Sequence, residues 1–204
     1  MKEYRVVLET TSDMAGGVSA AMADRPWPQY LKEEEERQRT AEETAEETEA
    51  VVTRVGFRRV NGSLALSANQ IRSMLQECTR ALLQGKGSKV LLHQQALRTN
   101  LWVEPTRILL NKEVPDGVAT LPRTIRRPPF ERSVVNQVEY VNPPITLEFT
   151  LKVVETGRGA VLTSEWLKTL FEHGQLFVGL GAHRGLEEFG RYELKVFEEI
   201  NGAA

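Results

Sequence analysis

The sequence predicts an α+β fold of the ferredoxin-like type, with two long insertions in a βαββαβ core. Three observations predict it. Residues 145–153 alternate between apolar and polar side chains, residues 68–82 repeat apolar residues at helical spacing, and a glycine-rich loop at 179–190 separates a second helix from a last strand. Right-handed crossovers would place both helices on one face of a four-stranded antiparallel sheet and leave the opposite face open.

Five segments have the residue pattern of strands. Residues 4–10 alternate and form the first strand, and the strict alternation of residues 145–153 is typical of a half-buried strand. We expect further strands at 89–92 and 101–110. The last strand begins at residue 192, where apolar positions again alternate with charged ones.

Two helices are expected to pack against this sheet. The first begins at Ser67, which forms a capping box with Gln70, and it ends at Gly85 and Gly87. Its apolar face includes Cys78, which we interpret as a small core residue because free cysteine packs as a hydrophobe.

The second helix is expected to start at Thr163 or Ser164 and to end at Gly174. Its apolar residues recur at helical spacing, so one face would be buried. The side chains expected on that face are Trp166, Leu167, Leu170 and Phe171.

Two insertions interrupt what we expect to be a single domain over residues 1–204. The first, residues 13–50, contains an acidic run at 32–49 with nine glutamates, three basic residues and a local charge of −6. This run has almost no apolar stripe, which indicates a solvated helix or a disordered arm. The second, residues 111–144, contains six prolines, and it also has four arginines that fall within ten residues of one another. It is interpreted as a stiff, basic, thumb-like segment, with a solvated proline-rich loop as the alternative.

The composition is that of an ordinary globular protein. The net charge is −2, so the −6 of the acidic run leaves +4 on the rest of the chain. That charge permits nucleic-acid binding without requiring it. No stretch approaches the ~18 apolar residues of a membrane helix, and the N-terminus lacks a secretory signal. We therefore expect a cytoplasmic protein without a membrane partner. One cysteine excludes an internal disulfide and a cysteine-rich metal site.

The glycine-rich loop is the most informative motif. It interleaves four glycines with basic side chains, namely Gly179, Gly181, Gly185 and Gly190 with His183, Arg184 and Arg191. Its opening Gly-x-Gly is similar to a dinucleotide fingerprint, but that fingerprint follows a strand and opens a helix. Here the loop follows a helix and opens a strand. Because glycines allow backbone N–H groups to approach phosphates closely, we interpret the loop as a ligand-facing backbone surface.

The helix, the motif G-L-G-x-x-R-G-x-x-x-F-G-R-Y and the closing strand resemble the C-terminal glycine-rich loop of the RAMP superfamily. These repeat-associated proteins bind guide RNA in CRISPR effector complexes and process its precursor. The residues that carry the match are Gly179, Gly181, Arg184, Gly185, Phe189, Gly190, Arg191 and Tyr192. Residues 61–75, NGSLALSANQIRSML, are similar to the family's stretch leading into its first helix, where small and basic residues face RNA. The resemblance implies that residues 14–50 and 111–144 correspond to the family's thumbs.

The resemblance implies a non-catalytic RNA-binding subunit of a CRISPR-type ribonucleoprotein in antiviral defence, which multimerises along a single-stranded guide RNA. Its partners would be RNA and other subunits or copies of itself, with no cofactor. An RRM-like core would leave its open sheet face for the ligand. The expected RNA-binding residues are Gly179, Gly181, His183, Arg184, Gly185, Arg191, Arg58, Arg59, Arg72, Arg123, Arg126, Arg127, Phe130 and Arg132. Phe130 would act as a stacking wedge beside the arginines of the second insertion.

Catalysis is the first alternative, as a metal-independent endoribonuclease that processes guide RNA. His183 would act as the general base on a 2′-hydroxyl, and Arg184 would stabilise the developing charge. His173, at the end of a helix, suits a structural role with the helix dipole, and neither His93 nor His173 has a sequence context that marks it as the partner acid of His183. Asp116 precedes a glycine, which is explained by turn chemistry.

A metal site and a function in protein interaction can also be judged from the sequence. No histidine and carboxylate cluster has the spacing of metal ligands, so no metal site is expected. The second alternative function is a protein-interaction module or mimic, in which the acidic insertion docks onto a ribonucleoprotein complex.

Overall fold

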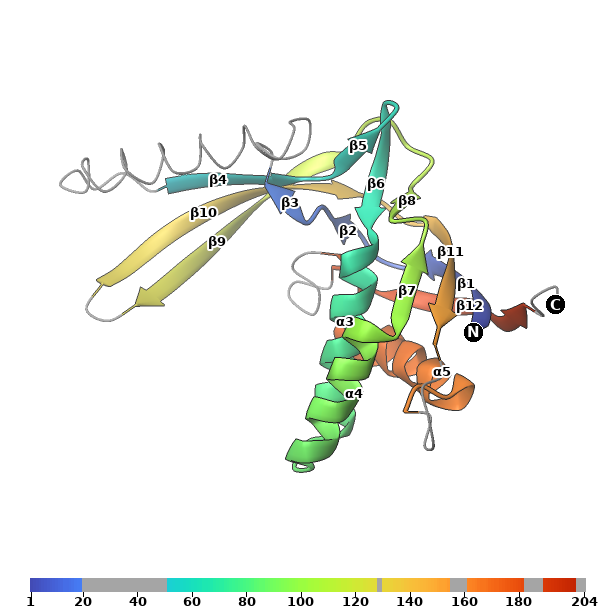
Figure 1. Ribbon diagram of the computed structural model, residues 1–204. Coiled ribbons are helices and arrows are strands. Elements are labelled where there is room, and N and C mark those ends of the chain that lie inside the picture. The colour runs from blue at the N-terminus through green and yellow to red at the C-terminus, as the bar shows by residue number, and fades with distance from the viewer. Residues whose placement is uncertain (20–50, 128–129, 155–160, 182–188, 201–204) are drawn as a thin grey trace.

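The computed structural model describes residues 1–19, 51–127, 130–154, 161–181 and 189–200. It mixes helices with antiparallel sheets, which confirms an α+β class (Figure 1). No helix within these ranges is long and apolar enough to cross a membrane.

A four-stranded sheet forms the centre of the body, in the order β12-β1-β11-β7. Its strands are β1 (Lys2–Thr10), β7 (Leu101–Glu104), β11 (Thr146–Val153) and β12 (Tyr192–Ile200). Every neighbouring pair is antiparallel. The first and last strands of the chain therefore lie side by side.

The alternation read from the sequence decides which face of this sheet is buried. Val6 lies opposite Phe149 and Leu8 opposite Leu147, and all four side chains are buried. Successive residues of a strand point to opposite faces, so the polar residues between them face away from the core. The expected strands at both ends of the chain are confirmed.

Three helices accompany the sheet, α3 (Ala68–Leu82), α4 (Gly87–Thr99) and α5 (Ser164–His173). The Ser67 hydroxyl accepts a hydrogen bond from the Asn69 N–H at 3.4 Å, one residue before the expected Gln70. The Thr163 hydroxyl caps α5 by accepting from the Trp166 N–H at 3.1 Å. Cys78 is fully buried on α3, as expected.

The prediction of a strand at residues 89–92 was wrong, because these residues lie within helix α4. The apolar run there was misleading: Leu91 is 69% exposed and Leu92 is 53% exposed. The buried residues of α4 come later in the helix and include Ala96 and Leu97. Packing of α4 against α3 through these residues thus overrides the strand-like local pattern.

The second insertion is also more regular than expected. Residues 111–144 contain a long antiparallel hairpin, β9 (Gly117–Arg127) and β10 (Phe130–Val141). Strand β4 (Val51–Gly56) runs parallel to β10. β-Branched residues between the prolines favour strand pairing, and Pro122 is tolerated because β9 pairs with β10 alone among the described strands.

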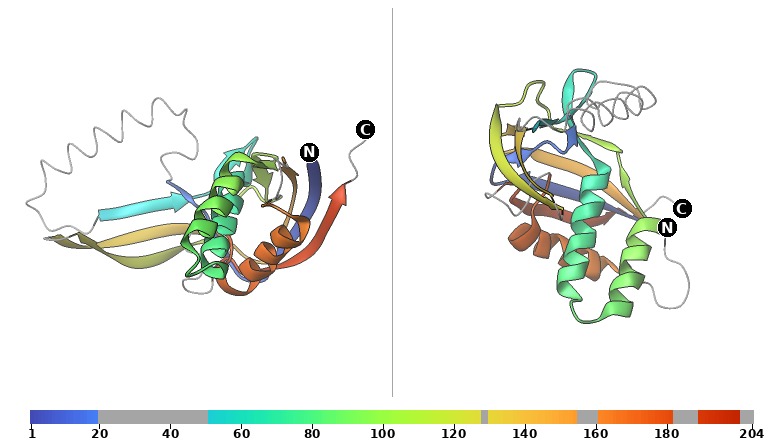
Figure 2. Two further views of the ribbon diagram at one scale, coloured as in Figure 1. Left: turned by 60° about the horizontal axis from the view of Figure 1, so that its bottom comes forward. Right: turned by 90° about the vertical axis from the view of Figure 1, so that its left-hand side faces the viewer.

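We call β4, β9 and β10 the arm, which projects from the body in Figures 1 and 2. Two short strands join its base, β2 (Met14–Ala15) beside β10 and β3 (Val18–Ser19) beside β4. The remainder of the expected acidic insertion, residues 20–50, lies outside the described residues.

A three-stranded sheet, which we call the small sheet, connects the arm to α3. It consists of β5 (Arg58–Val60), β6 (Ser63–Ser67) and β8 (Arg107–Leu109) in the order β5-β6-β8. Asn61 and Gly62, a sequence typical of a tight turn, both have positive φ between β5 and β6. The single strand expected at residues 101–110 is divided into β7 and β8. Figure 1 shows the small sheet where the arm leaves the body.

Candidate nucleic-acid interface

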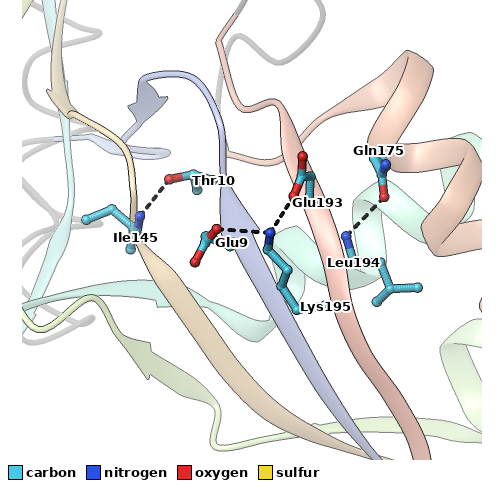
Figure 3. A network of polar contacts seen from close by, with 7 residues as sticks. All are labelled: Glu9, Thr10, Ile145, Gln175, Glu193, Leu194 and Lys195. Carbon is cyan, nitrogen blue, oxygen red and sulfur yellow. Dashed lines mark hydrogen bonds and ion pairs between the residues drawn. The ribbon is translucent and has the colours of Figure 1, made fainter.

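The glycine-rich loop begins differently from the expectation. Gly174 does not end the helical segment, since a π-helical turn, η1 (Gly174–Val178), continues from α5. Gln175 on this turn accepts a hydrogen bond from the Leu194 N–H of edge strand β12 at 3.0 Å (Figure 3). The turn therefore covers part of an otherwise unpaired strand edge.

The described glycines of the loop pack tightly against the protein's own backbone. Gly179, Gly181 and Gly190 are buried and adopt φ values of +77°, +80° and +78°. A Cβ at Gly190 would lie 1.9 Å from the Leu180 carbonyl oxygen. A Cβ at Gly181 would lie 2.6 Å from the Ala15 carbonyl oxygen. Both conformation and space require glycine at these positions.

The same loop anchors the base of the arm. Phe189 packs with Ala15, Leu121 and Val138, and its ring meets that of Tyr140 edge-on at 6.3 Å. The motif residues Gly179, Gly181, Phe189 and Gly190 thus connect the body with the arm. Their burial corrects the interpretation of the whole loop as a ligand-facing surface: the described glycines face protein.

The remaining loop expectations have mixed outcomes. His183, Arg184 and Gly185 lie outside the described residues, so their contacts with RNA stay predictions. Arg191 is exposed, and its backbone N–H donates to the Ser12 hydroxyl at 2.9 Å. This position beside the N-terminal strand is compatible with the expected role but does not test it.

The open face of the four-stranded sheet carries a ladder of ion pairs instead of a basic surface. Three basic side chains each lie between two glutamates. Arg5 pairs with Glu148 at 2.7 Å and with Glu198 at 3.1 Å. Hydrogen bonds to these two carboxylates raise the pKa of the Arg5 guanidinium.

The other two groups repeat this arrangement. Lys152 pairs with Glu104 at 2.6 Å and with Glu3 at 3.9 Å, and Glu104 raises the pKa of the Lys152 ammonium. Lys195 contacts Glu193 and lies 3.1 Å from Glu9, and Glu193 raises its pKa (Figure 3). We call these three groups the glutamate ladder.

Each group of the ladder has two carboxylates for one cation, so the ladder carries a net charge of −3. Nucleic-acid binding requires positive charge near the phosphates, and this face presents the opposite sign. The expectation that the open sheet face receives RNA is therefore not supported by its charge. Sequence alternation predicted the exposure of these residues, but the pairing of distant strands creates the ladder.

The outer face of the small sheet has the charge that the open face lacks. Arg58 lies opposite Ala65 on β6, and Arg107 lies opposite Ser67 two residues further along. The two arginines therefore share one face of the sheet. Partial burial and the charge of Arg58 lower the pKa of Arg107.

No described carboxylate forms an ion pair with Arg58 or Arg107. Arg107 Nη1 donates to the Ser67 hydroxyl at 3.4 Å and to the Thr106 carbonyl at 3.1 Å. These neutral contacts orient the guanidinium, and no carboxylate of the described residues compensates its charge. Two arginines on one face of a sheet form a surface that suits a phosphate. We call Arg58 and Arg107 the basic pair, and Ser67 is the serine that accompanies it.

The adjacent Arg59 has a structural environment. It points to the other face of β5, where its Nη2 lies 3.6 Å from Glu139 Oε1 on the arm. Glu139 Oε2 also accepts from the backbone N–H of buried Phe57 at 3.1 Å. Arg59 thus contributes to the joint between the arm and the small sheet, so the expected RNA contact is not favoured there.

The structure places the other expected RNA contacts in two regions. Arg72 lies on α3, where its Nε is buried and has no hydrogen-bond partner among the described residues. The remaining five lie on or beside the two strands of the arm's hairpin, in the order Arg123, Arg126, Arg127, Phe130 and Arg132. The register of the hairpin places these residues in its distal half. Their RNA contacts stay predictions.

The described histidines lack a catalytic environment. His93 Nδ1 lies 2.8 Å from the Lys89 carbonyl oxygen, and the His93 ring meets Trp166 edge-on. His173 packs against Phe177 with ring centroids 4.9 Å apart. Asp116 accepts hydrogen bonds from Lys112 and from the Asn142 N–H, which closes the base of the hairpin and lowers the Asp116 pKa. Within the described part of the chain, no three His, Cys, Asp or Glu side chains are grouped as metal ligands.

Comparisons with known proteins identify a similar fold. No protein-family profile and no curated protein matches the sequence. A solved structure, "Cryo-EM structure of the Type III-B Cmr-beta bound to cognate target RNA", contains a chain with a TM-score of 0.51 and 14% sequence identity. The alignment covers 99% of this chain and 61% of that chain, so this protein spans about three fifths of its neighbour. At this identity the similarity concerns the fold.

Sequence reasoning missed Arg107. It lies in the segment Pro105-Thr106-Arg107, which resembles an ordinary strand entry. Only the register between β6 and β8 brings Arg107 to Ser67 and near Arg58. The similarity of residues 61–75 to an RNA-facing stretch and the expected RNA contact of Arg58 were the signals that pointed to this region.

Proposed function

We propose that this protein binds single-stranded RNA as a non-catalytic, RAMP-type subunit of a CRISPR ribonucleoprotein. Its ferredoxin-like frame would hold an RNA-binding surface made of the small sheet and the arm. The fold similarity to a chain of an RNA-bound Type III-B complex supports this coarse assignment. The strand order β12-β1-β11-β7, with α3 between β1 and β7 and α5 between β11 and β12, supports the frame.

The single observation that carries the proposal is the basic pair. Arg58 and Arg107 are held on one sheet face next to the Ser67 hydroxyl, and neither is neutralised by a described carboxylate. Arginine in this arrangement contacts phosphate oxygens without reading base sequence. The ligand would therefore be bound mainly through its backbone.

The arm extends this surface. Four arginines lie on its hairpin strands β9 and β10, and strand β4 of the same arm leads directly into β5 through Phe57. RNA bound at the basic pair would continue along the arm, where we expect Phe130 to stack on a base. The acidic ladder on the open face would keep RNA away from the other side of the body.

The proposal predicts a specific loss in the double variant R58A/R107A. We expect its affinity for single-stranded RNA to fall about tenfold or more, because two phosphate contacts are removed. The slope of log K against log salt should decrease by about 1.4, since each contact to a single strand contributes about 0.7. Fluorescence anisotropy with a labelled RNA oligonucleotide, on protein freed of copurified nucleic acid, measures both quantities.

The matched control is R80A/R98A, which removes the same charge from exposed helix positions. Its affinity should stay within about twofold of that of the unchanged protein, because salt largely screens the effect of an exposed charge on a distant phosphate. Equal losses in both double variants would contradict a localised site. Absence of RNA binding by the unchanged protein at low salt would contradict the function itself.

A further inference from the structure

The open face of the four-stranded sheet has no role in the proposed function. It has an organised charge pattern, with one carboxylate in excess in each of three groups. The exposed fractions of the side chains of Glu104, Glu193 and Glu198 are 52%, 50% and 56%. The buried residues of α3, α4 and α5 belong to the core formed by the opposite face of the sheet.

The face also contains apolar contact area. Trp102 lies opposite Lys152 on the same face and is 45% exposed. Val7 and Val196 lie opposite each other near the middle of the sheet, and both are only partly buried. A half-exposed tryptophan beside carboxylates is typical of a protein-binding surface, since tryptophan is enriched among residues that dominate binding energy.

We propose that the open sheet face is a docking surface for a segment of another polypeptide that carries several Arg or Lys residues. The charge argues for this occupant: each of the three groups has one negative charge in excess, which a cation of the partner would neutralise. The Trp102 ring adds a second attraction, because a guanidinium stacks favourably on indole. The same charge excludes nucleic acid and a second acidic surface from this face.

The ladder also orders the carboxylates that the partner would contact. Arg5, Lys152 and Lys195 hold their glutamates in place through short ion pairs, so the carboxylates are ordered before binding. Pre-ordered groups lose less side-chain entropy on association. The protein would then connect RNA on one side to a basic partner on the other.

The test removes the excess charge of the ladder. The variant E104Q/E193Q/E198Q leaves Glu3, Glu9 and Glu148 within 4.0 Å of the three cations, so the net charge of each group becomes zero. The matched control E77Q/E165Q/E172Q removes three exposed glutamates from α3 and α5. The probe is a fluorescein-labelled nona-arginine peptide, and the binding is followed by anisotropy with the full chain.

We expect the ladder variant to bind the peptide about tenfold more weakly, and the control variant to bind within about twofold of the unchanged protein. Both variants keep the acidic run at 32–49, so peptide binding there would affect all three proteins equally. Equal affinities for the ladder and control variants would therefore overturn the proposal. Binding of single-stranded RNA should be retained by the ladder variant, which separates this result from failure of the RNA-binding proposal.

A second variant tests the apolar part and protects the experiment against misfolding. W102A should weaken the peptide complex severalfold while the thermal unfolding of the protein stays near that of the unchanged chain, because Trp102 lies outside the core. T150K, at the centre of the face between Arg5 and Glu104, should weaken the complex by adding positive charge. Unchanged peptide affinity in both variants would overturn the proposed surface.

Discussion

At the scale of single residues, backbone space and charge neighbours determine what each position does. Gly190 has both a positive φ and a neighbouring carbonyl that leaves no room for a side chain. Arg58 and Arg59 are adjacent in sequence, but strand alternation places Arg58 on the face that it shares with Arg107 and directs Arg59 to Glu139. The same residue type thus has two roles in neighbouring positions.

Gly190→Ala should destabilise the protein far more than a comparable change elsewhere. A Cβ would clash with the Leu180 carbonyl in addition to the cost of a positive φ, which is about 1–2 kcal/mol alone. We expect a melting temperature at least ~5 °C lower, as followed by thermal unfolding. Gly85→Ala is the matched control, because Gly85 has φ +83° and open space around it. A similar loss in both variants would show that the close contact is unimportant.

At the scale of elements, the arm is fixed to the body through a few residues at its base. Glu139 on β10 binds the Phe57 N–H and Arg59, while Phe189 from the glycine-rich loop fills the apolar space beside β2. These contacts set the direction of the hairpin relative to the small sheet. The geometry of the proposed RNA surface depends on them.

Glu139→Ala should loosen this joint. The substitution removes the acceptor of a buried backbone N–H at Phe57, which costs about 1–3 kcal/mol. Hydrogen exchange should become faster for the Phe57 amide and its neighbours on β4 and β10, while amides of α3 remain protected. Glu113→Ala, an exposed position, serves as the control. Unchanged exchange at Phe57 would contradict the role of Glu139.

Sequence-based prediction succeeded where local apolar spacing determines an element and failed where contacts between distant segments determine it. The helix at 68–82 and the strand at 145–153 were predictable, because their apolar spacing directly reflects one buried face. The strand expected at 89–92 failed because its leucines are exposed on a helix that packs through later residues. The hairpin of the arm was missed because prolines obscured a pairing that only the partner strand stabilises.

The candidate site follows the same rule. Arg58 could be selected from the sequence as a basic residue near a helix start. Arg107 joins it only through the pairing of β6 with β8, in which Ser67 lies opposite Arg107 although 39 residues separate them in the sequence. The glutamate ladder combines strands from both ends of the chain. Local patterns give the exposure of such residues, whereas their partners depend on the complete fold.

At the scale of the whole molecule, charge separates two surfaces. The small sheet presents the basic pair and leads to an arm rich in arginine, while the open sheet face carries a net charge of −3. This separation is the central claim of the functional account. RNA should contact the side of the small sheet and the arm, and it should avoid the open sheet face.

Photo-crosslinking tests this claim most directly. A single-stranded RNA containing 4-thiouridine is bound to the full chain, irradiated and digested, and the crosslinked peptides are identified by mass spectrometry. We predict crosslinks in peptides from residues 58–67 of the small sheet and from β9 and β10 of the arm. Crosslinks concentrated instead in peptides of β1, β11 and β12 would contradict the account, because they would place RNA on the acidic face.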